Sequence, residues 1–279
     1  MKINKELKNF INKNTLLRNK FPLIINENKT DNFLNHSKKY NSILNLELIN
    51  NIKYINKHLE YLNSKLYKNG ELIIRFESFQ SRRSKLKIKN FKIFSDLYLI
   101  YEFFLFRYLP KSPFKKIYYF FFKNKYRHLS KAEVFGRIVS CGFNIINYFN
   151  FKGYSYVLVE KISLPKYDNN PTYGALISLK RLGKNNKIIN VYKFRTMHPF
   201  SEYLHDFTLK KYGYGSKGKP KNDFRLTPWG KFLRKFWIDE LPQLYNLIRG
   251  DLKIVGIRPV GVRFFKDIPI DLQNDRKLL

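Results

Sequence analysis

The chain has 279 residues, and its 54 Lys and Arg against 21 Asp and Glu give a formal net charge of +33. This length allows one large domain or two small ones, and this charge predicts an anionic partner: nucleic acid, a phospholipid surface or a phosphorylated small molecule. The single cysteine, Cys141, excludes an internal disulfide bond, and the sequence lacks both a signal peptide and the run of ~20 apolar residues that a membrane-spanning helix needs.

The N-terminal part is polar, rich in Asn and Lys, and contains no glycine before Gly70. Apolar residues at helical spacing over 44–66 predict a helix. The stretch "NGELIIRFES" predicts a turn that leads into a strand over 72–76.

An aromatic-rich segment follows, with two helical stretches over 91–127 that are broken at Pro110 and Pro113, because proline ends or kinks a helix. Two interpretations stay open: two core helices of a globular domain, or a helix-break-helix element that dips into one leaflet of a membrane. The Phe and Tyr residues cluster beside Lys and Arg, which can reach lipid phosphates. We therefore expect an anionic membrane surface as partner of an element at about 91–123.

A helix signal is clear after residue 129. Ser130 and Glu133 match an S-x-x-E capping box, and Gly142 suits the end of this helix. Two strands, over 143–149 and 154–160, are predicted to follow.

The Pro- and Asn-rich stretch 165–174 predicts a connector, and we place the boundary between two regions, 1–164 and 165–279, at its start. Beyond it, "ALISLKRLGKNNKIINVYKFRTM" predicts two strands joined by a Gly-Lys-Asn-Asn turn, and "HPFSEYLHDFTLKKYGYG" a short helix before a glycine-rich stretch. "TPWGKFLRKFW" and "ELPQLYNLIRG" predict two short helices, and "LKIVGI" (252–257) predicts a strand.

Two adjacent acidic residues, Asp239 and Glu240, stand out in this basic chain. They can be a helix cap and its dipole partner, with Pro242 tolerated in the first turn. They can also be a reactive centre, because a carboxylate pair among guanidinium groups is ionised and can hold Mg²⁺ beside a diphosphate. The basic residues expected near this helix are Lys193, Arg195, Arg225, Arg234 and Arg258.

Motifs in this region occur in a recognisable order: K-F-R-T-M, D-x-R-x-T-x-x-G-x-x-L-R, D-E-L-P-Q-L-x-N, G-D and V-G-x-R-P. Over about 171–265 the chain resembles the bacterial sugar transferase family, the monotopic polyprenyl-phosphate phosphoglycosyl transferases. The resemblance implies transfer of a sugar 1-phosphate from a UDP-sugar to undecaprenyl (polyprenyl) phosphate, with release of UMP. It places this step at the cytoplasmic face of the bacterial inner membrane, on a monotopic or peripheral protein, as the first membrane step of exopolysaccharide, capsule, O-antigen or glycan assembly.

The resemblance also assigns roles to residues. Asp239 would be the nucleophile that forms a covalent aspartyl-phosphosugar intermediate, and Glu240 its partner, both holding Mg²⁺. The phosphate-binding residues would be Lys193, Arg195 and Arg258, and the supporting residues Asp223, Arg225, Thr227 and Gln243.

The chain departs from the family pattern in three places. Strands and a polar connector stand where the family has an apolar re-entrant helix, Ile257 replaces the first proline of a Pro-Arg-Pro motif, and no Pro-Gly segment follows before Leu279. A truncated, catalytically inactive family member is therefore an alternative. A basic nucleic-acid-binding protein is another, but the chain shows no recognition motif and we expect no nucleic-acid partner.

The first region faintly resembles the later half of a class I methyltransferase-like domain, in "NLELINNIKYINKHLEYLNSKLYKNGELIIRF" and "LSKAEVFGRIVSCGFNIINYFNFKGYSYVLVEK". Without glycine before position 70 it cannot form the glycine-rich cofactor loop of such enzymes, so we expect a scaffold or remnant. The predicted fold class is mixed α/β: a small membrane-associated α/β transferase domain, preceded by a partial Rossmann-like region that carries the helix-break-helix element.

Overall fold

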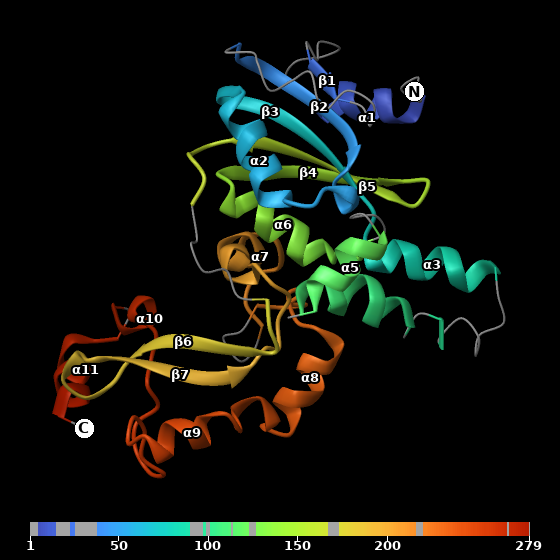
Figure 1. Cartoon of the computed structure of the whole chain (residues 1–279). Helices are drawn as coiled ribbons and strands as arrows, with labels where there is room; N and C mark the ends of the chain where they lie inside the picture. The colour runs from blue at the N-terminus through green and yellow to red at the C-terminus, as the bar shows by residue number, and fades with distance from the viewer. Residues whose placement is uncertain are drawn as a thin grey trace. The chain divides into compact units, whose positions relative to one another are not determined.

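The computed structural model describes residues 5–14, 23–25, 38–89, 97–98, 101–112, 114–122, 127–166, 173–215, 220–266 and 268–278. The chain forms two compact units, coloured by residue number in Figure 1. Unit 1 consists of Met1–Pro171 and Pro199–Asp223, and unit 2 of Thr172–His198 and Phe224–Leu279.

Unit 1 is built on a five-stranded mixed sheet with strand order β1-β2-β3-β5-β4 (Figure 1). β1, β2 and β3 run parallel, whereas β5 is antiparallel to both β3 and β4. Its strands are β1 (Leu23–Ile25), β2 (Tyr40–Leu48), β3 (Leu66–Phe76), β4 (Phe143–Phe151) and β5 (Tyr154–Lys161). Mixed α/β architecture is thus confirmed, and the predicted strands over 72–76, 143–149 and 154–160 lie within β3, β4 and β5.

The core of unit 1 lies where the central strands β3 and β5 meet the helices. Leu72 pairs with Val159 and Ile74 with Val157 across the two strands, and all four side chains are buried because the hydrophobic effect favours removing them from water. The helices α2 (Ile55–Ser64) and α6 (Lys131–Ser140) are joined by the Asn63 amide, which donates to the carbonyl oxygen of Cys141 at 2.9 Å.

Helix α6 begins as its sequence predicts. The Ser130 hydroxyl caps it by accepting the backbone N–H of Glu133 at 3.1 Å. The Glu133 carboxylate also accepts a hydrogen bond from Arg137 at 3.0 Å, one turn further along the helix. Gly142 follows the helix end with φ of 86°, a left-handed conformation that glycine adopts without strain.

Residues 199–223 pack within unit 1, although unit 2 surrounds them in sequence. They contain a 3₁₀ turn, η6 (Ser201–Leu204), and helix α7 (His205–Tyr212), which confirms the short helix predicted there. The packing against α6 is close: a Cβ atom at Gly136 would lie 2.1 Å from the carbonyl oxygen of Phe200. A side chain at position 136 would therefore force these two segments apart.

Unit 2 is smaller, and its sheet consists of the antiparallel pair β6 (Leu176–Leu182) and β7 (Ile188–Phe194). The 3₁₀ turn η5 (Lys184–Asn186) joins them, as the Gly-Lys-Asn-Asn signal predicts. The remaining elements are α8 (Pro228–Lys235), the 3₁₀ turn η7 (Ile238–Glu240), α9 (Gln243–Ile248), α10 (Val262–Lys266) and α11 (Ile270–Leu278).

Two predicted elements are wrong. The expected helix over 44–66 begins only at Ile55, because 40–48 is strand β2, whose Leu44 and Leu46 are buried in the sheet. The expected strand over 252–257 does not form: its bends expose 86% of both Ile254 and Val255, and the nearest pairing is an isolated bridge between Leu182 and Val260. Alternation and apolar character are sufficient for a strand only where a partner strand is available.

The aromatic segment of unit 1 forms short helices around a break. Helix α3 (Phe79–Lys89) is followed by a π-helical turn η3 (Phe103–Tyr108), a 3₁₀ turn η4 (Leu109–Lys111) and helix α5 (Lys115–Phe122). The break at Pro110 is confirmed, whereas residues 90–96, 99–100, 113 and 123–126 of the predicted element lie outside the described residues. None of the helices described reaches the length and apolar character that crossing a bilayer requires.

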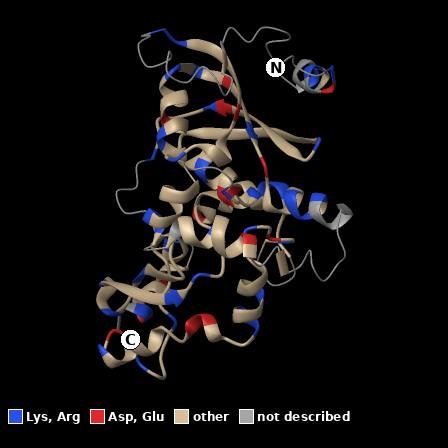
Figure 2. Ribbon diagram, turned by 45° about the vertical axis from the view of Figure 1, so that its right-hand side comes forward, with Lys and Arg blue, Asp and Glu red and all other residues tan. Residues whose placement is uncertain are grey.

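The remaining described elements of unit 1 are helix α1 (Lys5–Asn14) and the 3₁₀ turn η2 (Ile49–Asn51). Lys and Arg are distributed over both units, and acidic residues are fewer, as the ribbon in Figure 2 shows.

Candidate active site

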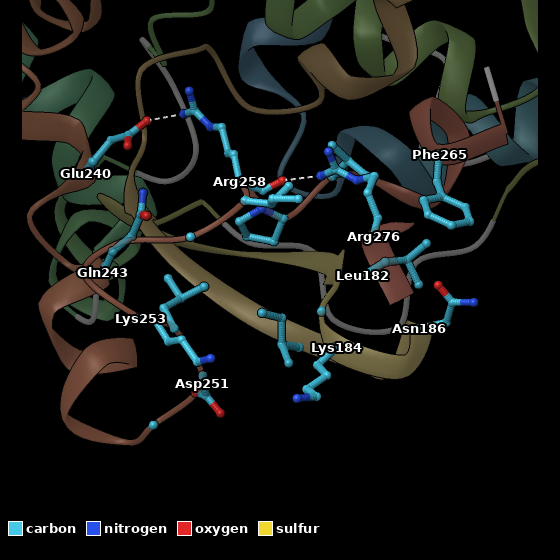
Figure 3. Close-up of a pocket in the computed structure, with 18 residues that line it drawn as sticks. Leu182, Lys184, Asn186, Glu240, Gln243, Asp251, Lys253, Arg258, Phe265 and Arg276 are labelled. Atoms are coloured by element: carbon cyan, nitrogen blue, oxygen red, sulfur yellow. Dashed lines mark hydrogen bonds and ion pairs between the residues drawn. The ribbon is translucent and has the colours of Figure 1, made fainter. Parts of the chain in front are cut away.

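A cavity of about 380 Å³ opens in unit 2. The turn after β6, the segment 250–260 and helix α11 contribute to its wall, as the close-up in Figure 3 shows. Its wall is rich in charge, and the basic residues Lys184, Lys253, Arg258 and Arg276 outnumber the acidic residues Glu240 and Asp251. Such a wall favours an anionic ligand.

Glu240 is the acidic residue that forms ion pairs with the basic residues. Its Oε1 atom accepts hydrogen bonds from Nζ of Lys193, near the end of β7, and from Nη2 of Arg258. Figure 3 shows the bond from Arg258 on the cavity side. Burial raises the pKa of Glu240, but the hydrogen bond from Lys193 and the charges of Lys193 and Arg258 outweigh burial, so the pKa lies below its ordinary value. Glu240 is therefore ionised at neutral pH.

Asp239 lies beside Glu240 in η7 and is 7% exposed. Trp237 lies between α8 and η7 and has a left-handed φ of 58°. Glu240 is among the described residues that line the cavity, and Asp239 is not. The pair thus divides into one acid on the cavity wall and one buried next to it.

The alternative of a helix cap fails for this pair. Helix α9 begins at Gln243, its N-cap is Pro242, and no side chain forms a capping hydrogen bond there. The two acids instead occupy a separate 3₁₀ turn that precedes the helix. A capping role therefore does not account for two carboxylates at this place.

Asn246 fixes helix α9 to strand β7. Its side chain is fully buried and accepts the backbone N–H of Tyr192 at 2.9 Å. It also donates to the carbonyl oxygen of Asn190 at 2.6 Å and to the carboxylate of Asp251 at 3.1 Å. Because β7 carries Lys193 and α9 follows Glu240, this amide holds in register the two elements that form the ion pair.

The other predicted site residues are placed as follows. Gln243 lines the cavity and hydrogen-bonds Glu240, which adds to the lowering of the glutamate pKa. Arg195 is not among the described cavity-lining residues, and its Nε atom donates to the carbonyl oxygen of Gly174 at 2.8 Å. The structure thus brings Lys193, Gln243, Arg258 and the acidic pair together and leaves Arg195 off the wall.

The supporting residues that precede α8 act on the backbone. The Thr227 hydroxyl caps α8 by accepting the N–H of Gly230 at 2.9 Å and donates to the carbonyl oxygen of Thr196 at 3.0 Å. The Arg225 carbonyl accepts the N–H of His198 at 2.9 Å. Asp223 is the last residue of unit 1 by compactness, so its predicted part in aiming the pair stays a prediction.

Three basic residues of the cavity were absent from the sequence-based site: Lys184, Lys253 and Arg276. Arg276 comes from α11, and its Nη2 atom donates to the carbonyl oxygen of Arg258 at 2.6 Å (Figure 3). The sequence offers one signal for it, an arginine on a short helix that follows the V-G-x-R-P motif. Nothing in the spacing shows that this helix folds back to the cavity.

The residues present fit a magnesium ion only in part. The described residues contain no cluster of three or more His, Cys, Asp or Glu side chains. Asp239 and Glu240 supply two carboxylates, and Glu240 already uses Oε1 for Lys193 and Arg258. Mg²⁺ sites commonly take one or two carboxylates and complete their shell with water and substrate phosphate, so this donor set is compatible with such a site.

Comparison with known proteins identifies the C-terminal part. Residues 161–277 match the family model described as bacterial sugar transferase. By sequence, this segment is similar to the bacterial sugar transferase family. It contains the cavity, the acidic pair and the basic residues around them.

Named relatives match the chain over part of their length. The chain is 43% identical over 89 residues to galactosyl transferase CpsE of Streptococcus agalactiae, covering 32% of this chain and 20% of that protein. It is 37% identical over 91 residues to undecaprenyl-phosphate galactose phosphotransferase of Salmonella typhimurium, covering 31% and 19%. Exopolysaccharide production protein ExoY of Rhizobium meliloti is 42% identical over 86 residues, covering 29% and 38%. The chain therefore spans about a fifth of the length of the first two relatives.

Among solved structures, a 16S rRNA methyltransferase of T. thermophilus aligns with 64% of this chain and 35% of its own. Its TM-score is 0.21 and its sequence identity 8%. This likeness carries no argument about the fold or function of unit 1.

Proposed function

We propose that this protein is a phosphoglycosyl transferase that moves a sugar 1-phosphate from a UDP-sugar to polyprenyl phosphate. One observation carries the proposal: Glu240 is held by Lys193 and Arg258 on the wall of a basic cavity, inside the segment that matches sugar transferases. The relatives' names support a polyprenyl-phosphate acceptor, since the Salmonella typhimurium protein is named undecaprenyl-phosphate galactose phosphotransferase.

The cavity charge suits a nucleotide diphosphate. Arg258 and Arg276 present guanidinium groups, which bind phosphate oxygens through paired hydrogen bonds, and Lys184 and Lys253 add positive charge. We infer that the donor diphosphate lies among these four residues, with its sugar phosphate directed towards the turn that holds Asp239 and Glu240. Arg195 would act from outside this wall.

In the first step, an Asp239 carboxylate oxygen forms a bond to the phosphorus that carries the sugar. The bond from this phosphorus to the bridging oxygen breaks, and UMP leaves with that oxygen. An oxygen of polyprenyl phosphate then attacks the same phosphorus, which breaks its bond to Asp239 and regenerates the carboxylate. Such covalent catalysis divides one difficult displacement into two easier ones.

Glu240 would work beside this nucleophile without forming a bond to the sugar phosphate. Held by Lys193 and Arg258, it stays ionised and keeps the two cations close to the reacting phosphate. Asp239 and Glu240 would hold Mg²⁺, which on binding would neutralise charge on the diphosphate.

Exposed apolar side chains support action at a membrane surface. On α8, η7 and α9 they include Phe232, Trp237, Leu244 and Ile248, which is 84% exposed. A polyprenyl chain is soluble only in a bilayer, so we infer that unit 2 works as a peripheral or monotopic module on the cytoplasmic face of a bacterial inner membrane.

Unit 1 has a separate role in this proposal. We infer that it is a methyltransferase-like scaffold without methyl transfer, because its strands 1-2-3 run parallel and its last two form an antiparallel pair at one edge. Binding of S-adenosylmethionine to the full chain, measured by calorimetry, would contradict this.

The test of the reaction uses the full chain in detergent with polyprenyl phosphate, Mg²⁺ and a panel of UDP-sugars. We expect UMP release with at least one sugar, and a labelled sugar phosphate trapped on the protein when polyprenyl phosphate is omitted. Asp239→Asn removes the attacking charge at constant size and should abolish both the release and the trapped label. Asp271→Asn, an exposed acid on α11, is the matched control and should retain both.

The outcomes separate the alternatives. UMP release that persists in Asp239→Asn would rule out the covalent mechanism. No release by the unchanged chain with any sugar would contradict the proposed activity and favour an inactive family member.

A further inference from the structure

The helix-break-helix element of unit 1 buries two charged residues and exposes several aromatic ones. Glu102 is fully buried and Arg107 is 6% exposed. In contrast, Phe104, Phe120 and Phe121 expose 57%, 78% and 70% of their surfaces. Soluble proteins normally show the opposite distribution, and clustered exposed aromatic residues indicate a contact surface.

Buried ion pairs fix this orientation. The Glu102 carboxylate accepts from Nε of Arg82 at 2.9 Å and from its Nη2 at 2.5 Å, which ties the element to helix α3. Arg107 donates to the carbonyl oxygen of His128 at 3.2 Å and lies 3.9 Å from the Glu133 carboxylate on α6. Turning the aromatic residues inwards would expose or separate these charges. The outward aromatic face is therefore specified by the fold.

The two arms of the element pack on each other. The ring of Phe106, in η3, lies 5.1 Å from that of Phe122 in α5, and the ring of the fully buried Tyr118 lies 5.4 Å from that of Phe122. The break between the arms is short, since Ser112 closes it by donating through its backbone N–H and its hydroxyl to the Leu109 carbonyl. The exposed aromatic residues thus belong to two arms that pack on each other.

Positive charge adjoins the aromatic face. Lys115 and Lys116 open helix α5 and are exposed, and exposed Arg83 lies on α3, whose ribbon is blue at Lys and Arg in Figure 2. An anionic phospholipid surface matches both features, because it takes up aromatic rings at the headgroup level and attracts lysine. A nucleic acid would match the positive charge, but it would not give the exposed aromatic rings a hydrocarbon environment.

We propose that the described parts of residues 97–122 form a membrane-docking element, which inserts Phe104, Phe120 and Phe121 into one leaflet of an anionic bilayer. Lys115 and Lys116 contact lipid phosphates. This docking belongs to unit 1 and does not depend on the sugar-transfer reaction.

Flotation of the full chain with vesicles tests the docking. We expect binding to vesicles of phosphatidylcholine with phosphatidylglycerol, and a loss of about tenfold or more in partition coefficient for the double variant Phe120→Ser, Phe121→Ser, since each exposed ring loses its transfer into the leaflet. The matched control is Tyr67→Ser with Leu164→Ser, two exposed apolar residues of unit 1 outside the element, at 53% and 76% exposure. This control should bind as the unchanged chain does.

A charge variant separates the two contributions. Lys115→Gln with Lys116→Gln should weaken binding to the anionic vesicles by about tenfold, because each lysine near the surface contributes electrostatic attraction. It should leave binding to pure phosphatidylcholine vesicles unchanged. Circular dichroism should show native secondary structure for every variant, since all substituted side chains are exposed.

The following outcomes would overturn the proposal: flotation unchanged in the phenylalanine variant, equal losses in the control, or a change in oligomeric state with no loss of flotation. The last would assign the face to a second copy of the chain, and loss of single-stranded DNA binding alone would assign it to nucleic acid. UMP release in detergent gives an independent readout. The phenylalanine variant should retain it, so a failure of docking and a failure of the proposed reaction appear in different assays.

Discussion

The two units use acidic residues differently. In unit 1, Glu102 and Glu133 have fully buried side chains, and each is paired with arginine at 3.0 Å or less. In unit 2, the side chain of Glu240 is 24% exposed and faces a cavity while it holds Lys193 and Arg258. The chemistry of the pairs is alike, but only the Glu240 pair faces a cavity that a ligand can enter. Exposure to a cavity therefore distinguishes a reactive ion pair from one that fixes packing.

The largest effect should come from Glu240→Gln, which removes the charge and keeps the size. UMP release should fall by about 100-fold or more, the cost of losing one preorganised electrostatic group. The thermal unfolding temperature should change little, because the pair is partly exposed and such pairs stabilise weakly. If Glu240→Gln kept its activity, the proposed difference between the ion pair at the cavity and the buried ion pairs of unit 1 would be wrong.

The converse variant is Glu102→Gln. It leaves Arg82 with Glu77, at 3.6 Å, as its acidic partner, and we expect unit 1 to lose about 2 kcal/mol of unfolding free energy, below the value for a fully buried pair because Arg82 is 25% exposed. UMP release per folded molecule should stay within about twofold. Urea unfolding measures the first quantity. Glu160→Gln, half-buried on β5, is the control and should change stability by less than about 0.5 kcal/mol.

The units should also differ in their response to acid. Burial lowers the pKa of His128 from 6.5 to about 4, although Glu102 opposes this. The folded state thus binds the proton on His128 more weakly than the unfolded chain does. The contribution of His128 to the free energy of unfolding is therefore complete above pH 6.5 and is lost as the pH falls towards 4. The loss is at most about 3 kcal/mol. Unfolding by urea at pH 7 and at pH 5 should show it, and His128→Gln should reduce the difference.

Glu240 titrates in a lower range. Its pKa in the folded state lies below the ordinary value of 4.5, so its contribution is present above that value and is lost as the pH falls through the folded pKa. Unit 1 should therefore weaken between pH 6.5 and 5, where the Glu240 pair is still intact. An acid transition of UMP release at the same pH as the loss of unit 1 stability would contradict this separation.

The smallest effect concerns a backbone cap in unit 2. Thr227→Ala removes the hydroxyl that caps α8, and we expect a loss of about 1 kcal/mol in unfolding free energy. Thr227→Ser keeps the hydroxyl and should recover most of it. Equal losses in both variants would mean that the methyl group, and not the cap, stabilises the helix.

The sequence predicted those parts of the fold that local chemistry decides. The cap of α6 by Ser130, the end of that helix at Gly142 and the turn between β6 and β7 follow from side chains close to them in sequence. The error over 44–48 has a non-local cause, because β2 becomes a strand through its neighbours β1 and β3. The exposed segment 252–257 is not a strand, because no described strand pairs with it.

The candidate site was also predictable only where local motifs contain its residues. Lys193, Gln243, Arg258 and the acidic pair lie in motifs, and the structure brings them to one place. Arg276 reaches the cavity through the return of α11, which no local pattern reveals. The burial of Asp239 is likewise set by the packing around η7, and its predicted role as nucleophile stays a prediction.

The close contact of Gly136 with Phe200 limits where this polypeptide can be cut into fragments that fold. The family match runs continuously over 161–277, yet residues 199–223 of it fold with unit 1, so the backbone passes from one unit to the other at 171–172, 198–199 and 223–224. A fragment beginning at 165 would uncover Leu204, which the intact protein buries completely. Grafting this transferase segment onto another N-terminal partner would thus require a matching packing surface for residues 199–223.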